Sequence, residues 1–86
     1  MTGIETNMGP QIVVLDRGFV YYGNVTIKGD ILTIERAKNI RHWGTTRGLC
    51  QLAKDGPQLR TILDDAGTVV APMRAVIHII QCSQPW

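Results

Sequence analysis

Residues 41–48 carry the side chains best suited to binding a ligand. The segment reads Arg41, His42, Trp43, Gly44, Thr45, Thr46, Arg47 and Gly48. Guanidinium groups grip oxyanions through paired hydrogen bonds, an indole stacks on planar rings, and glycines let backbone N–H groups approach a ligand closely. These eight residues therefore form the predicted ligand-binding site.

The charge around this segment favours a small anionic partner. Five basic residues and no acidic residue fall between positions 36 and 54, although the formal net charge of the chain is only +2. Nine lysines and arginines in all are too few for a protein dedicated to duplex DNA, which usually presents a continuous basic face. A nucleotide fits better than a long strand, because Trp43 has few other stacking side chains to accompany it.

Each of these features also has a purely structural explanation. The indole of Trp43 is equally suited to filling the end of a small apolar core, and residues 44–48 to forming a capped turn before a helix. His42 has no nucleophile at a recognisable spacing, and Asp64 and Asp65 are typical of a turn before a glycine. We therefore predict no catalytic residue, no metal ligand, no cofactor and no enzymatic activity.

Alternating and β-branched segments predict a mainly β fold around the site. The expected strands cover residues 12–15, 19–28, 31–40, 60–63, 68–71 and 74–82, with a tight turn at 29–30, a bulge at Gly23 and a turn at 64–67. A short helix is expected after Gly48, capped by Thr45 or Thr46 and stopped by residues 55–57. This pattern indicates a small SH3/Sm-like antiparallel barrel with one short helix, because closure removes exposed edges.

Size and composition predict one small domain that associates with copies of itself. Residues 1–10 lack an apolar period and are expected to be a flexible N-terminal arm, with residues 11–86 as the single β-barrel domain. The hydrophobic content of 44% is more than the small core of an 86-residue chain can bury, so we expect a homo-oligomer. Two isolated cysteines, no signal-like segment and no long apolar run predict a cytoplasmic protein with no membrane association.

The central hairpin resembles the Sm-like small barrel family. Residues 22–25 place a glycine in a bent strand that turns through residues 29–30 into the next strand, and residues 67–70 and 74–77 match the short closing pair. The resemblance implies a ring-forming oligomer that binds single-stranded nucleic acid, which is an alternative function. The chain departs from the family at Thr33, which replaces an RNA-binding asparagine, and at residues 71–74, which replace an Arg-Gly pair.

A second resemblance covers most of the domain. The segment 41–49, followed by residues 56–57, 61–64 and 67–69, resembles a family of short phage and prophage proteins. With the nucleotide site, this resemblance implies an anti-defence sponge in the host cytoplasm that sequesters a cyclic nucleotide messenger of host immunity, because capture requires tight binding without turnover. An inhibitor that binds a host protein through Trp43 and the arginines is a further alternative.

Overall fold

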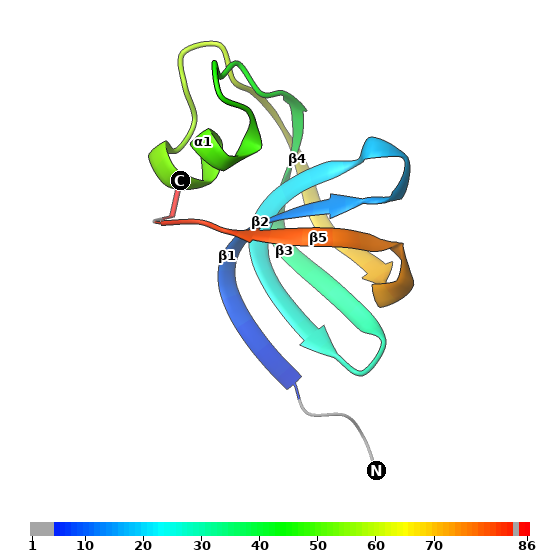
Figure 1. Ribbon diagram of the computed structural model, residues 1–86. Coiled ribbons are helices and arrows are strands. Elements are labelled where there is room, and N and C mark those ends of the chain that lie inside the picture. Colours follow the sequence, from blue (N-terminus) through cyan, green and yellow to red (C-terminus); the bar gives the residue numbers. More distant parts are fainter. Residues whose placement is uncertain (1–4, 84) are drawn as a thin grey trace.

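The computed structural model describes residues 5–83 and 85–86, which form one bent antiparallel sheet and a short helix (Figure 1). The strands are β1 (Glu5–Leu15), β2 (Val20–Lys28), β3 (Ile31–His42), β4 (Ile62–Pro72) and β5 (Val76–Gln81). The helix α1 (Leu49–Asp55) follows β3, and 3₁₀ turns at Asp16–Gly18 and Met73–Ala75 join β1 to β2 and β4 to β5. The strand order is β4-β3-β2-β1-β5.

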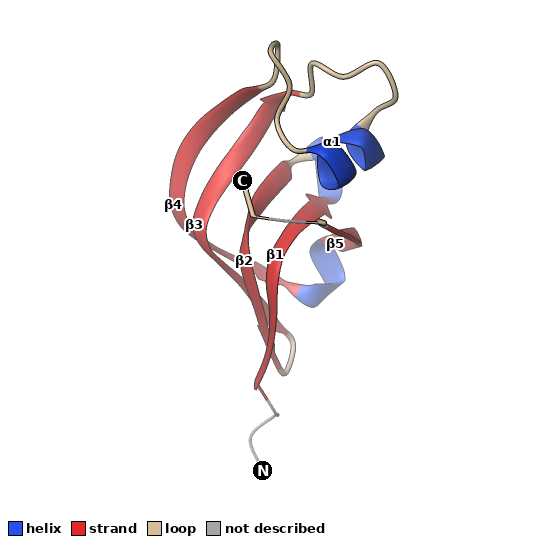
Figure 2. Cartoon of the chain, turned by 90° about the vertical axis from the view of Figure 1, so that its left-hand side faces the viewer, coloured by secondary structure: helices blue, strands red, loops and turns tan. Residues whose placement is uncertain are grey.

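The sheet is open, which corrects the predicted barrel. The mainly β fold with one short helix is confirmed, but β4 and β5 are edge strands, and no ladder joins them within the described residues. Pro72 ends β4 without an N–H to donate, and β5 pairs with β1 on the other side of the sheet. The 3₁₀ turn Met73–Ala75 leads from β4 into β5, but no ladder among the described residues closes the sheet, and Figure 2 shows it curving without closing.

A bulge where β2 crosses β3 bends the sheet. The irregularity predicted at Gly23 is confirmed, because the register shift places Gly23 opposite two residues of β3, Arg36 and Ala37. Arg36 accommodates the extra residue with a left-handed φ of 51°. A Cβ on Gly23 would collide with Ile34 Cγ2 and lie 2.9 Å from the Glu35 carbonyl oxygen. Only glycine fits this crossing unless β3 moves.

The bulge also gives the sheet an apolar cluster on each face. Side chains alternate along a strand, so one extra residue moves Ile40 to the face opposite Leu32 and Ile34. The first cluster contains Val13, Leu15, Val25, Leu32, Ile34, Ala37 and Ala71. The second contains Ile12, Val20, Tyr22, Ile40 and the α1 residues Leu52 and Ala53. The helix thus covers one of two apolar faces (Figure 2).

The helix lies where the apolar spacing predicts it. Leu52 and Ala53 are buried, and Gly56 ends the helix with a φ of 80° and an N–H that donates to the Leu52 carbonyl oxygen at 2.8 Å. A φ of this sign is accessible to glycine without strain, so Gly56 allows the chain to leave the helix here. In the part of the chain that the structure describes, no helix is long and apolar enough to cross a bilayer.

Two expected irregular segments are strands instead. Residues 5–10 of the predicted arm pair with β2, from Glu5 opposite Lys28 to Pro10 opposite Asn24, while residues 1–4 lie outside the described part. The turn predicted at residues 64–67 lies inside β4. In both places neighbouring strands supply backbone partners, and this tertiary pairing overrides weak local propensity.

The crossing at Gly23 yields the first prediction. Gly23→Ala is expected to lower the free energy of unfolding by about 3 kcal/mol, since the new methyl meets backbone of β3 that cannot turn away. Gly18→Ala is the control, because its Cβ meets nothing within 4 Å and its cost of about 1 kcal/mol reflects only the φ of 82°. Equal losses in urea unfolding would contradict the steric role of Gly23.

The two thiols yield a second prediction. Burial raises the pKa of the Cys82 thiol to about 11, whereas Cys50 is exposed on α1. Because only the thiolate reacts, about one Cys82 thiol in a thousand is reactive at pH 8, and its rate should rise about tenfold per pH unit up to its pKa. Thiol titration of Cys50→Ser tests this, with Cys82→Ser as the fast-reacting control. A fast reaction of Cys82 at pH 8 in the folded protein would exclude its burial.

Candidate functional site

The predicted site lies where β3 leads into α1. Arg41 and His42 are the last residues of β3, residues 43–48 form the following loop, and Gly48 directly precedes the helix with a φ of 80°. This loop and the segment leading into β4 lie side by side at one end of the sheet (Figure 1). The residues are therefore held by a strand end, a helix start and a second loop.

Backbone contacts with that second loop fix the position of Trp43 and Gly44. Thr61 Oγ1 donates to the Trp43 carbonyl oxygen at 2.7 Å. A Cβ on Gly44 would collide with the backbone of Arg60 and Thr61, and Gly44 has a φ of 66°. Glycine is thus required here for two reasons, and the close approach brings Arg60 into the neighbourhood of the site. Sequence reasoning missed this contact because the two loops are separated by the whole helix.

The side chain of Gln51 organises the rest of the loop. Its Oε1 accepts hydrogen bonds from the Thr46 N–H at 3.1 Å, the Thr46 hydroxyl at 3.3 Å and the Arg47 N–H at 2.9 Å. The Thr45 hydroxyl donates to the Gly48 carbonyl oxygen at 2.9 Å, and the N-cap residue Gly48 has no side chain with which to cap the helix. The predicted threonine cap is therefore wrong. Gln51 also satisfies two N–H groups that an anion would otherwise use.

A pocket with a volume of about 330 Å³ brings together five of the eight predicted residues. Its lining consists of Arg41, His42, Trp43, Gly44 and Thr45. The other three residues, Thr46, Arg47 and Gly48, lie outside that lining. Trp43 is 42% exposed and belongs to neither apolar cluster, so its indole does not fill the core.

Acidic residues of β4 balance part of the positive charge. Arg41 Nε lies 2.8 Å from Asp64 Oδ2, and Lys38 Nζ lies 3.2 Å from Asp65 Oδ1. Both pairs are solvent-exposed, and such pairs contribute only about 0–1 kcal/mol to stability. An anionic ligand can therefore compete with Asp64 for the guanidinium. The aspartates were missed as partners because the sequence predicts a turn where β4 passes beside β3.

The described residues do not supply a metal site. In residues 5–83 and 85–86 there is no group of three or more His, Cys, Asp or Glu side chains arranged to hold a metal ion. His42 has hydrophobic and cationic neighbours in the pocket rather than carboxylates. The chemistry that this lining offers is hydrogen bonding, stacking and charge.

Comparisons with known proteins found no match to this chain among family models, curated proteins or solved structures. The phage-family and Sm-like resemblances therefore rest on the sequence motifs alone.

The contacts of Gln51 yield a prediction for the loop. Gln51→Ala removes the shared acceptor and is expected to lower the free energy of unfolding by about 1 kcal/mol. Amide hydrogen exchange at Thr46 and Arg47 should become faster. Lys54→Ala on the same helix is the control, since Lys54 is exposed. Unchanged exchange at both amides would show that Gln51 does not hold the loop.

Proposed function

We propose that the protein binds a small anionic nucleotide in the pocket at the end of β3. The observation that carries this proposal is that the half-exposed Trp43 and Arg41 line the same pocket of about 330 Å³. A base that stacks on Trp43 can place its phosphate against Arg41, which supplies paired donors. Small-ligand pockets span about 300–1,000 Å³, so this volume suits one nucleotide unit.

The biological role that we propose is sequestration. A sponge needs groups that bind and none that turn the ligand over, and the pocket offers stacking and ionic groups at Trp43 and Arg41. A cyclic dinucleotide messenger has two nucleotide units, so its capture would use one pocket from each of two copies of the chain. The proposed ligand is thus a cyclic nucleotide of host immunity, and the proposed assembly is a homo-oligomer.

The two sheet edges support this assembly. Val70 on β4 is 61% exposed and Ile77 on β5 is 58% exposed. Neither edge strand has a second ladder within the described residues, and unpaired edges are templates for pairing with another chain. Apolar side chains beside free backbone groups make these edges the proposed contact surfaces between copies.

Light scattering tests the assembly. We expect a multimer at micromolar concentration, and Val70→Lys should weaken it because a lysine on an edge strand opposes pairing. Leu59→Lys is the control, since Leu59 is fully exposed in the loop between α1 and β4 and belongs to neither edge strand. A monomer of 9.5 kDa for the unaltered protein would overturn this part of the proposal.

Calorimetric titration with a panel of cyclic mono- and dinucleotides tests the binding. Trp43→Ala should reduce affinity by about 1–3 kcal/mol without unfolding the sheet, because the indole lies outside both clusters. Arg41→Lys should also reduce it, since lysine keeps the charge but loses the planar pair of donors. Arg74→Lys is the control, because Arg74 follows the opposite end of β4.

Salt dependence separates a nucleotide from a nucleic-acid strand. Two phosphate contacts should lose about tenfold or less in affinity between 50 and 200 mM salt, whereas a strand with many contacts loses about a thousandfold or more. A mixed oligonucleotide is titrated in parallel. Binding of the oligonucleotide alone, with a steep loss of affinity as the salt concentration rises, would favour the Sm-like alternative. The absence of any binding would overturn the proposed function and favour a protein partner.

A further inference from the structure

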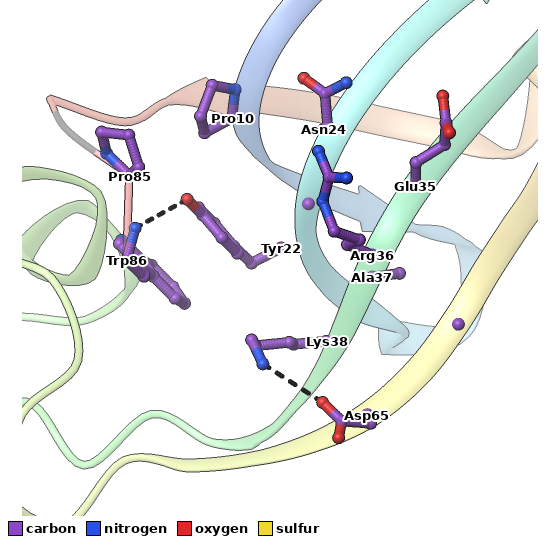
Figure 3. A pocket seen from close by; sticks show the side chains of 12 residues that line it. Pro10, Tyr22, Asn24, Glu35, Arg36, Ala37, Lys38, Asp65, Pro85 and Trp86 are labelled. Carbon is purple, nitrogen blue, oxygen red and sulfur yellow. Dashed lines mark hydrogen bonds and ion pairs between the residues drawn. The ribbon is translucent and has the colours of Figure 1, made fainter.

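We propose that a cavity over the β3 bulge is a second binding site, which takes an uncharged, planar heteroaromatic ring with hydrogen-bond donors and acceptors (Figure 3). The cavity has a volume of about 620 Å³ and extends from the segment 85–86 across β2 and β3 to β4. It shares no lining residue with the pocket at residues 41–45.

The wall of this cavity is a rigid aromatic pair. The rings of Tyr22 and Trp86 stack with their centroids 3.9 Å apart and an interplanar angle of 4°. The backbone N–H of Trp86 donates to the Tyr22 hydroxyl at 2.9 Å, so stacking and a hydrogen bond hold the same two residues. Pro10 and Pro85 add further ring surface beside them (Figure 3). Because Tyr22 is only 6% exposed, the aromatic surface open to a flat ligand is mainly that of Trp86, and a surface already in place binds flat ligands with little ordering cost.

The cavity exists because of the bulge. Gly23 contributes no side chain to it and cannot gain one, since β3 lies too close. Gly67 of β4 also lines the cavity, and a Cβ there would meet nothing within 4 Å, so the space beside it is open. Bulges occur next to binding sites because they redirect a side chain, and the left-handed Arg36 is the residue redirected here. Figure 3 shows its guanidinium extending toward Asn24.

The polar lining favours a ligand that forms hydrogen bonds over a ligand that carries a net charge. Arg36 and Lys38 contribute two cations, and Glu35 and Asp65 contribute two carboxylates. Asp65 is already paired with Lys38. The Asn24 amide offers both donors and an acceptor, as the edge of a nucleobase does. A charge-balanced rim beside an aromatic wall therefore fits a purine-like ring better than a phosphate.

The two tryptophans allow each pocket to be observed alone. Trp43 lines one pocket and Trp86 the other, and the chain has two tryptophans in all. In Trp43→Phe, the fluorescence reports only on Trp86, and in Trp86→Phe only on Trp43. Trp86→Phe keeps a ring against Tyr22 and removes an indole N–H that is buried without a partner among the described residues. Its fold should therefore be retained.

Titration of Trp43→Phe with adenosine and guanosine tests the proposal. We expect saturable quenching of Trp86 emission that hardly changes with salt, because the nucleosides carry no charge. Adding Arg36→Gly should weaken binding about tenfold, since a hydrogen bond from a charged donor is lost. Glycine adopts the left-handed φ of Arg36 freely, so the bulge is kept.

A matched control isolates the role of Arg36. Arg17 also has a left-handed φ, 66°, but it lies in the Asp16–Gly18 turn and does not line the cavity. Arg17→Gly should leave the quenching unchanged. Absence of quenching at millimolar nucleoside, or equal affinity in the two glycine variants, would overturn the proposal. Nucleotide binding at Trp43, followed separately in Trp86→Phe, can fail or succeed independently.

Discussion

The contact between Gly23 and the backbone of β3 is the constraint on which the rest of the structure depends. β2 and β3 cross so closely at Gly23 that no Cβ fits there, and Arg36 takes up the extra residue of β3. The resulting change of alternation gives β3 one buried face before the bulge and the other face after it. A five-stranded sheet of this size can bury both faces of β1 only because α1 covers the second one.

The loop at residues 43–48 is fixed by a second set of local requirements. Gly44 allows the backbone of the segment before β4 to approach, and Gln51 Oε1 accepts hydrogen bonds from the N–H groups of Thr46 and Arg47. A loop whose own polar groups are satisfied presents its side chains rather than its backbone to a ligand. Under the proposed function, recognition at this end of the sheet would therefore depend on the side chains of Trp43 and Arg41, because Gln51 already accepts from the N–H groups of Thr46 and Arg47.

Local chemistry was enough to predict the hairpin, the bulge and the helix. Gly29–Asp30 turns the chain, Gly23 marks the bulge, and the spacing of Leu52 and Ala53 defines a helical face. The sequence did not predict that residues 64–67 continue a strand, because these turn-forming residues are held in β4 by backbone pairing with β3, which lies far away in the chain. We predicted a closed barrel from the number of strands and the advantage of removing exposed edges, whereas closure requires the two edge strands, β4 and β5, to pair with each other.

The lining of the smaller pocket is contiguous in the sequence, whereas the lining of the larger cavity is assembled from distant segments. Arg41 to Thr45 line one pocket together, and their adjacency in the sequence is what suggested them as candidate site residues. The larger cavity combines residues from β1, β2, β3, β4 and the segment 85–86, and no local pattern joins Tyr22 to Trp86. Pairing between strands decides which groups meet, and a single sequence shows pairing only through turns that are short enough to recognise.

The pairing of β4 with β3 also brings acidic side chains beside residues 36–54, which the sequence alone shows as one basic segment. β4 runs beside β3 and places Asp64 and Asp65 against Arg41 and Lys38, so the middle of the segment is close to neutral. Among the described residues, Arg36 and Arg47 have no carboxylate within ion-pair distance, and they flank this neutral stretch. A uniform basic track for a nucleic-acid strand is thereby interrupted, because such a track needs continuous cations. The positive charge that remains does not form one continuous face, because Arg36 lines the larger cavity with Trp86, whereas Arg47 lies outside the lining of the Trp43 pocket. This separation favours compact ligands over extended ones.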